Sequence, residues 1–191
     1  MSILTKFGSP LLFTAALIAA PPVLADFYVG GSVGWSDFDD GNAASEINVG
    51  AVDGSDAGFK IFGGYQLNQY LGFELTYVNL GKAAYSGTFQ GTTVTGGTLD
   101  TTGLNASVVG MLPINPSFGL FGKVGLFKWE TDVQDVRNGA PFKAKRDGND
   151  GSYGIGASYN LNPKLALRAE WERYKAAADI DLLSLGVAFK F

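Results

Sequence analysis

The stretch LLSLGVAFKF, residues 182–191, ends the sequence with a strict alternation of side chains. Apolar and aromatic residues occupy every second position, and serine, glycine, alanine and lysine stand between them. Successive side chains of a β-strand point to opposite faces, so this period of two predicts a strand with one apolar face. The rest of the sequence must decide whether that face meets a protein core or lipid.

The same alternation recurs along the sequence and predicts eight strands. They span residues 26–36, 57–67, 71–81, 102–112, 118–129, 152–161, 165–174 and 182–191. Each run lasts roughly 10 residues, the length that a tilted strand needs to cross a bilayer. In the run 118–129 both faces carry bulky side chains, so its orientation stays open.

Short and long links between these strands alternate strictly. The short links, at 68–70, 114–117 and 162–164, are rich in asparagine and proline, as turns are. The long links cover 37–56, 82–101, 130–151 and 175–180. All short links therefore lie at one end of the strands, which is the plan of an antiparallel outer-membrane barrel.

The polar faces of the strands indicate which side faces inward. They are built largely from glycine, serine and alanine, which suit the crowded interior of a narrow barrel. The apolar faces carry aromatic residues near the strand ends, as an interfacial girdle would: Trp35, Tyr65, Tyr77, Tyr159, Trp171, Phe189 and Phe191. The sequence thus predicts an all-β, eight-stranded antiparallel up-and-down transmembrane β-barrel. A soluble ligand-binding barrel is the alternative, and membrane partitioning of the native protein separates the two.

Residues 1–25 differ from the rest of the sequence. Lys6 precedes the apolar run 11–20, and the small residue Ala25 follows. This order predicts a signal peptide over 1–25 and a barrel domain over 26–191; a disordered or anchoring N-terminus is the alternative. No other apolar stretch is long enough to predict a membrane-spanning helix.

The composition argues against several function classes. The sequence has no cysteine and no histidine, so it lacks thiolate chemistry, the commonest general base and the commonest metal ligand. An enzyme acting on lipid at the outer leaflet would need a nucleophile with such a base. The net charge of −4 gives no reason to expect a nucleic-acid partner. We therefore predict no catalytic residue, no cofactor and no metal site.

Several stretches resemble the eight-stranded transmembrane domain of the outer membrane protein A family: FYVGGSVGWS, GGYQLNQYLGFELTYVNLG, FGKVGLFKWE, LALRAEWERY and LLSLGVAFKF. The resemblance implies a Gram-negative outer-membrane protein with periplasmic termini and extracellular long loops. It also implies that Phe191 is a signal read by the barrel-assembly machinery. Many relatives continue into a periplasmic peptidoglycan-binding domain, whereas this sequence ends with the barrel, so no cell-wall tether is expected.

Few charged residues fall on the inward face: Lys60, Glu74, Lys123, Arg168, Glu170, Glu172 and Lys190. Glu74 and Arg168 lie at similar depth, as do Lys123 and Glu170 one step further, so these pairs should form, because an unpaired buried charge is costly. The family is known for such an interior network, and these four residues match its positions. Ser107 and Ser158 match two further positions with hydroxyls, which implies a thinner network. The charges either plug the barrel or gate a path for ions or small solutes.

The long links carry charge of both signs. The acidic residues of 37–56 could bind divalent cations, or form a solvated acidic loop. Residues 82–101 are rich in threonine and glycine, which suggests a mobile or strand-extending loop. Arg137, Lys143, Lys145 and Arg146 could contact phosphates of lipopolysaccharide, or belong to an ordinary mixed-charge loop.

Taken together, these patterns predict a non-enzymatic outer-membrane barrel with a structural and surface-interaction role. Its partners would be outer-membrane lipids, lipopolysaccharide, the barrel-assembly machinery and a host or cell-surface ligand of the long loops. The alternative is a small porin-like channel gated by the interior charges.

Overall fold

A computed structural model describes residues 26–38, 52–89, 92–176 and 179–191. In this part of the chain, eight long strands form the wall of a barrel: β1 (Asp26–Phe38), β3 (Ser55–Gln66), β4 (Leu71–Phe89), β5 (Thr92–Pro113), β6 (Phe118–Arg137), β7 (Ala140–Asn162), β8 (Leu165–Lys175) and β9 (Asp179–Lys190). A two-residue strand, β2 (Val52–Asp53), pairs with β4. The predicted signal peptide, residues 1–25, lies outside the described residues.

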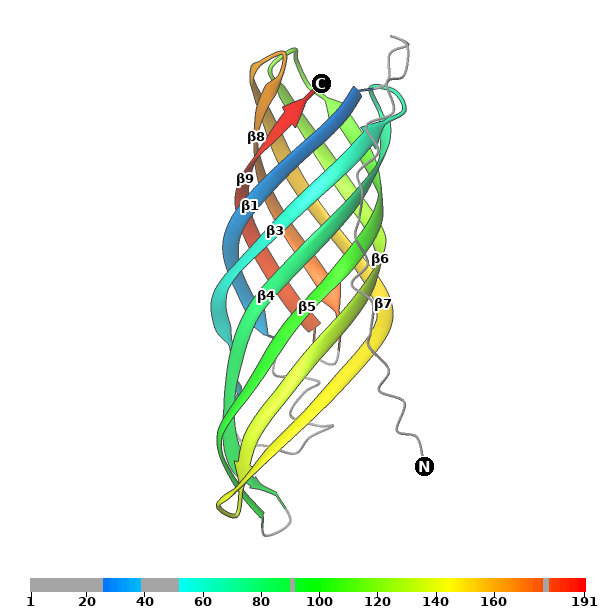
Figure 1. Cartoon of the computed structure of the whole chain (residues 1–191). Coiled ribbons are helices and arrows are strands. Elements are labelled where there is room, and N and C mark those ends of the chain that lie inside the picture. Colours follow the sequence, from blue (N-terminus) through cyan, green and yellow to red (C-terminus); the bar gives the residue numbers. More distant parts are fainter. Residues whose placement is uncertain (1–25, 39–51, 90–91, 177–178) are drawn as a thin grey trace, which may run out of the picture.

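The strands close into a ring of antiparallel neighbours (Figure 1). Each of the eight long strands pairs with the next long strand along the chain, and β9 pairs with β1, where Trp35 lies opposite Leu183. Because the ring is closed, each long strand has a hydrogen-bonded neighbour on both sides. A barrel in a membrane needs this closure, because hydrocarbon cannot form hydrogen bonds with free backbone groups. The predicted eight-stranded antiparallel barrel is confirmed.

In each of the three predicted short turns, an asparagine side chain accepts backbone hydrogen bonds in the same way. Oδ1 of Asn68, Asn115 and Asn162 each accepts two backbone N–H groups, one from the residue before the next strand and one from the first residue of that strand. An asparagine side chain replaces a backbone acceptor in this way at a tight turn. We call the end of the barrel that carries these turns the short-turn end; the C-terminus lies there (Figure 1).

Strands β4 to β7 extend well beyond β8, β9 and β1 at the opposite end, which we call the projecting end (Figure 1). The prediction of a loop over 130–151 is wrong. Strands β6 and β7 pair continuously up to Arg137 and Ala140, and Asn138 and Gly139 form the turn with φ of 48° and 83°. Two successive residues with positive φ suit a tight hairpin, because that turn follows the natural twist of the strands. In the region 82–101, strands β4 and β5 also extend, as the strand-extending alternative predicts.

The projection leaves a free sheet edge on β7. Strand β7 pairs with β6 over Ala140–Tyr159, but its pairing with β8 begins at Ser152 and Tyr174. Residues 140–151 therefore have a strand partner on one side. Lys143 and Lys145 stand on this stretch with exposed side chains, and lysine is a common means of protecting a free edge from pairing.

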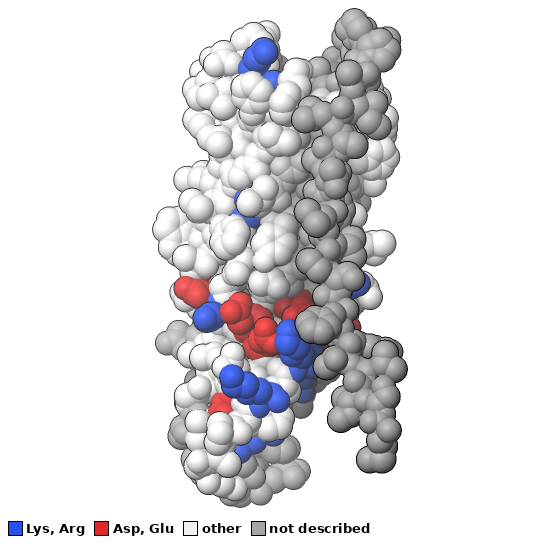
Figure 2. Space-filling view, in the orientation of Figure 1, with Lys and Arg blue, Asp and Glu red and all other residues white. Residues whose placement is uncertain are grey.

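The outer wall is apolar between two aromatic rings. Phe27, Tyr65 and Phe73 lie side by side near the short-turn end, and Trp35 and Tyr77 mark the other ring. On β1, eight residues separate the rings, which corresponds to roughly 20 Å at the usual rise and tilt. Figure 2 shows the visible charged residues gathered mostly in a belt toward the projecting end. In β6, Leu120, Val124 and Leu126 point outward, which resolves the open orientation.

Glycines on the inner face make room for aromatic rings of neighbouring strands. A side chain at Gly103 would overlap the ring of Phe127, and one at Gly64 would overlap the ring of Tyr28. Glycine on one strand thus makes room for an aromatic ring on another. Buried side chains occupy the middle of the lumen, as expected for eight strands.

Candidate functional site

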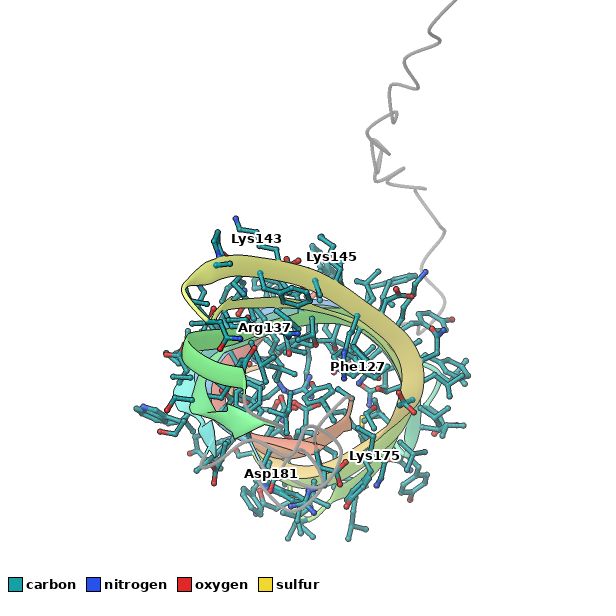
Figure 3. The ribbon with its side chains drawn as sticks, turned by 90° about the horizontal axis from the view of Figure 1, so that it is seen from below. Phe127, Arg137, Lys143, Lys145, Lys175 and Asp181 are labelled. Atoms are coloured by element: carbon teal, nitrogen blue, oxygen red, sulfur yellow. The ribbon has the colours of Figure 1, made fainter. Side chains whose placement is uncertain are left out.

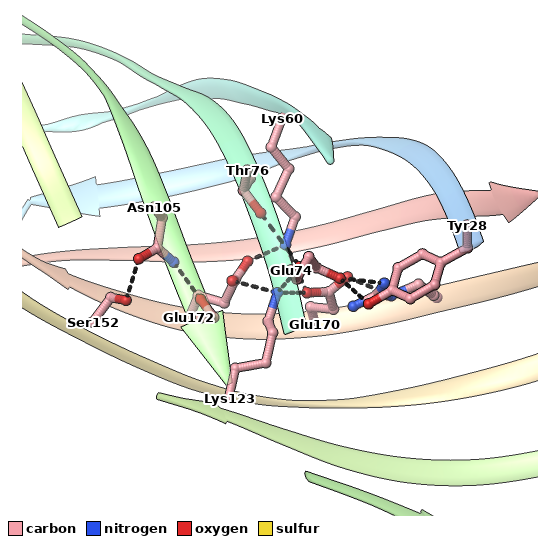
Figure 4. Close-up of polar contacts among 11 residues, drawn as sticks. Tyr28, Lys60, Glu74, Thr76, Asn105, Lys123, Ser152, Glu170 and Glu172 are labelled. Atoms are coloured by element: carbon pink, nitrogen blue, oxygen red, sulfur yellow. Dashed lines mark hydrogen bonds and ion pairs between the residues drawn. The ribbon is translucent and has the colours of Figure 1, made fainter. Parts of the chain in front are cut away.

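The centre of the lumen holds a cluster of charged side chains from four strands (Figure 4). We call it the charge network: Lys60 from β3, Glu74 from β4, Lys123 from β6, and Arg168, Glu170 and Glu172 from β8. Alternation along β8 places its three members on the inner face, two residues apart. All six are buried, with residue exposures of 1% to 7%.

Each cation of the network contacts at least two carboxylates. Lys123 Nζ lies 3.0 Å from Glu74 and 2.6 Å from both Glu170 and Glu172. Arg168 Nη1 donates to Glu74 at 2.8 Å, and its Nε lies 2.9 Å from Glu170. Lys60 Nζ contacts Glu170 at 2.7 Å and also Glu172.

Three positive and three negative groups therefore meet in one cluster with no net charge. Balance matters here, because breaking a buried pair leaves a charge without compensation. The pairs Glu74–Arg168 and Lys123–Glu170, expected from their depth, are both in contact. The arrangement ties β3, β4, β6 and β8 together across the lumen.

Neutral polar groups continue the network toward both ends (Figure 4). The hydroxyl of Tyr28 donates a hydrogen bond to the carboxylate of Glu74 at 2.9 Å. On the other side, Asn105 donates to Ser107 at 3.0 Å and accepts from Ser152 at 2.7 Å. Ser158 lies apart, with a long 3.5 Å contact to the Gly119 carbonyl. Ser107 thus belongs to the polar filling of the lumen, and Ser158 lies nearer the short-turn end.

Aromatic rings surround the guanidinium group of Arg168 on the short-turn side. Its central carbon lies 4.5 Å from the ring centroids of Phe62 and Phe121 and 5.7 Å from that of Tyr28. Cation–π contact of this kind is strongest for desolvated cations. Arg168 is therefore held by two carboxylates and by the rings, and its position is fixed.

A second cluster of buried side chains lies between the charge network and the projecting end. We call it the apolar plug, and sequence reasoning missed it: Phe38, Val78, Leu80, Ala83, Tyr85, Phe127, Trp129, Val133, Tyr174, Ile180 and Leu182 are buried together. The rings of Phe127 and Tyr174 lie 4.8 Å apart, and Phe127 points into the lumen in Figure 3. The signal was present in β6, where Phe127 and Trp129 share the face of Lys123.

Lys190 lies away from the charge network, at the short-turn end. Its Nζ donates to Oδ1 of Asn160 at 3.0 Å. It lines an open cavity of about 240 Å³, the short-turn vestibule, whose floor includes Arg168. The expectation that Lys190 belongs with the other inward charges is wrong. Arg168 lies opposite Gly186 on β9, and Lys190 lies four residues further along that strand.

The four basic residues predicted to contact lipopolysaccharide lie on the projecting hairpin of β6 and β7, and Figure 3 labels three of them. Two are engaged within the protein. Arg137 Nε donates to Asp135 at 3.0 Å and stacks on Phe142 at 3.5 Å. Lys145 contacts Glu130 at 2.6 Å. Among the described residues, no carboxylate lies within ion-pair distance of Lys143 or Arg146, which leaves them open to an external anion.

Asp135 forms a buried polar contact inside this hairpin, beyond the membrane-spanning part of the strands. Tyr85 donates to it at 2.6 Å, and Arg137 donates from the same strand. Burial opposes ionisation of Asp135, but the hydrogen bonds from Arg137 and Tyr85 outweigh burial and hold its pKa below the usual value. For Tyr85, burial and the hydrogen bond to Asp135 both raise the pKa.

The acidic link 37–56 is described at its two ends. Residues 39–51, with Asp39, Asp40 and Glu46, lie outside the described residues. Asp56 has a structural role, since it accepts the backbone N–H groups of Ala57 and Lys82. Within the described ranges, no group of three acidic side chains is placed to hold a metal ion, and no helix is long and apolar enough to cross a membrane.

Comparison with known proteins gives consistent matches. A family model, the OmpA-like transmembrane domain, matches residues 22–191. Outer membrane protein A of Shigella flexneri is 29% identical over 187 residues, which cover 93% of this chain and 52% of that protein. Its counterpart from Yersinia pseudotuberculosis is 28% identical over 190 residues, with the same coverage of 93% and 52%. The chain spans about half the length of the curated relatives it matches.

Solved structures show the same fold. OprG of Pseudomonas aeruginosa superposes with a TM-score of 0.61 at 14% identity, over 87% of this chain and 96% of that one. Ail of Yersinia pestis, solved in complex with the heparin analogue sucrose octasulfate, gives a TM-score of 0.54 at 17% identity, over 87% and 97%. At such identities the likeness concerns the fold alone.

Proposed function

The chain belongs to the family of OmpA-like transmembrane domains, and from that premise we propose that it is a non-enzymatic barrel with a structural and surface-interaction role. It is an outer-membrane β-barrel, as its relatives are. We further propose that its lumen is closed and that the projecting sheet contacts ligands outside the cell. The lack of histidine and cysteine in the whole sequence supports a role without catalysis.

The observation that carries the closed lumen is the presence of two different barriers in series. The charge network ties four strands across the lumen, and the apolar plug follows it toward the projecting end. An ion that passed the first barrier would still have to leave water to cross the second, which is costly. A gated channel would need both to open together.

Conductance in planar bilayers tests the closed lumen. We expect the refolded wild type, Glu74→Ala and Lys123→Ala all to be silent, because each variant keeps the apolar plug intact. The exposed Lys82→Ala serves as the matched control for loss of a lysine. Discrete openings in Glu74→Ala or Lys123→Ala, absent from the control, would favour the alternative of a small channel gated by the charge network.

We propose that the short-turn end and both termini face the periplasm and that the projecting end faces the outside. Asparagine turns at one end and strands that project at the other support this orientation. Protease added to intact cells should cut at the projecting end and leave the short turns at Asn68, Asn115 and Asn162 uncut. Cleavage at the short turns of intact cells would reverse the orientation.

For the surface role, we propose that Lys143 and Arg146 contact anionic groups such as the phosphates of lipopolysaccharide. Arg137 and Lys145 belong to the same basic surface, but their ion pairs with Asp135 and Glu130 reduce the charge they offer. Purified lipopolysaccharide and a heparin analogue serve as separate probes of lipid-borne and carbohydrate-borne anions, including a host or cell-surface ligand. Lys143→Gln with Arg146→Gln should weaken binding, and Lys82→Gln with Lys175→Gln should leave it unchanged.

We also propose that Phe191 is the signal read by the barrel-assembly machinery, after removal of residues 1–25 as a signal peptide. The ring of Phe191 is exposed and packs edge-on against Phe189 at 5.3 Å. Deletion of Phe191 should lower outer-membrane accumulation in cells while refolding into detergent proceeds as in the wild type. Equal accumulation of both proteins would exclude this role.

A further inference from the structure

The short-turn vestibule is a cavity of about 240 Å³ that neither barrier of the lumen fills. Inward side chains of several strands line it, among them Tyr28, Val109, Met111, Phe121, Arg168 and Lys190. Its volume lies below the range of about 300 to 1,000 Å³ that is usual for drug-sized ligands. The vestibule therefore suits a small molecule.

The charges that line the vestibule have one sign. Arg168 lies at its floor and Lys190 near its rim, and its lining includes no aspartate or glutamate. Among the described groups, the C-terminal carboxylate included, no anion lies within ion-pair distance of Lys190. Its ammonium donates instead to the neutral amide oxygen of Asn160. A cation in a recess with low-dielectric walls attracts a counter-ion strongly.

The remaining lining supplies polar and apolar groups from different strands. Asn160 and Ser158 on β7 and Gln66 on β3 supply neutral hydrogen-bonding groups, which we call the polar side. Val109, Met111 and Phe121, from β5 and β6, supply the apolar side. An inorganic ion would use the polar side alone. A small organic anion would satisfy both sides.

We propose that the short-turn vestibule binds a small organic carboxylate that carries an apolar body. Its carboxylate accepts hydrogen bonds from the ammonium of Lys190 and the amide of Asn160, and its body packs against Met111, Val109 and Phe121. Charge-assisted hydrogen bonds are about twice as strong as neutral ones, so the charge of Lys190 dominates the polar part of recognition. This site lies on the short-turn side of the charge network, which contributes Arg168 to its floor, and does not require that the lumen be closed.

Chemical-shift titration of the barrel, refolded in zwitterionic micelles, tests the site with benzoate as the probe. Benzyl alcohol has the same ring without the charge, and inorganic phosphate has charge without the ring. We expect benzoate to shift the amide signals of Asn160, Lys190 and Met111 and to bind at least tenfold more tightly than either comparison molecule. Signals of the projecting hairpin should not move.

Three variants sharpen the test. Lys190→Gln should weaken benzoate about tenfold and leave benzyl alcohol unchanged, Lys190→Arg should retain most of the affinity, and Lys82→Gln should behave as the wild type. An otherwise unchanged spectrum of each variant verifies its fold. Equal binding of benzoate and benzyl alcohol, binding of phosphate as tight as that of benzoate, shifts located elsewhere, or an unchanged affinity in Lys190→Gln would each overturn the proposal.

Discussion

Glu74 and Arg168 stand on β4 and β8, which face each other across the ring of eight strands, and their Oε2 and Nη1 atoms lie 2.8 Å apart. The pair therefore spans the lumen at its centre. It couples opposite walls of the barrel that share no backbone hydrogen bond. Lys123 lies between them on β6, and its ammonium contacts the carboxylates of Glu74, Glu170 and Glu172.

The first prediction concerns this pair. Glu74→Gln or Arg168→Met alone should lower the free energy of unfolding by about 3–5 kcal/mol, because each leaves a buried charge uncompensated. The double variant should cost less than the sum, since two lysines and two glutamates then remain in balance. Urea unfolding in lipid vesicles measures these changes. The exposed pair Lys82–Asp100, at 3.7 Å, is the matched control, and its removal should cost under about 1 kcal/mol.

The second prediction is that both barriers must be removed before the lumen conducts. Lys123→Ala combined with Phe127→Ala should produce openings in planar bilayers that neither single variant shows. Leu126 neighbours Phe127 but is 73% exposed on the outer wall, so Lys123→Ala with Leu126→Ala is the control and should stay silent. A silent double variant at Phe127 would mean that another constriction closes the lumen.

The third prediction concerns pH. The pKa of Asp135 in the folded protein lies below that of an unfolded aspartate, about 3.9. Its contacts therefore stabilise the hairpin above that value, and the stabilisation is lost as pH falls through the folded pKa. At pH 7, Asp135→Asn should lower hydrogen-exchange protection of the hairpin amides about threefold, a modest effect because Arg137 is 44% exposed and water screens the pair. Once pH falls below the folded pKa of Asp135, the variant and the wild type should converge.

The fourth prediction concerns the free edge of β7. Lys143 lies on this edge, whereas its cross-strand partner Gln134 lies on β6, which has β5 on its other side. Lys143→Val should increase self-association of the detergent-solubilised barrel, because a charged residue no longer blocks edge-to-edge pairing. Gln134→Val adds the same side chain away from the edge and should sediment as the wild type. Equal association of both variants would indicate that hydrophobicity alone drives it.

Much of this architecture follows from the sequence because the side-chain period of a strand is two. That period placed Glu74, Lys123, Arg168 and Glu170 inside and at the right depth relative to each other. It also placed the outward apolar residues, and asparagine in each short link marked the turns. These features depend on local chemistry that a single strand or turn already contains.

The apolar plug could not be found in the same way. Its members look like lipid-facing residues, and the alternation is broken where the plug forms. A register shift between Asn79 and Lys82, with φ of 78° at Gly81, brings both Leu80 and Ala83 to the inner face. A glycine within a predicted strand was the available signal for this bulge. The dipeptide Asn138–Gly139 is a typical sequence for a two-residue hairpin turn. Its flanking residues, however, are too polar for the alternation of a strand to be recognised.

The unequal lengths of the strands give the rim of this barrel a high side and a low side. From the ring of aromatic residues at Trp35 and Tyr77, the sheet of β4 to β7 continues for several more residues, whereas β8 ends at Lys175. An epitope inserted between Asn138 and Gly139 would be carried on a stiff stalk, clear of the bilayer and open to an antibody. The same epitope inserted after Lys175 would lie close to the lipid headgroups. The longer strands would then restrict the access of an antibody to it.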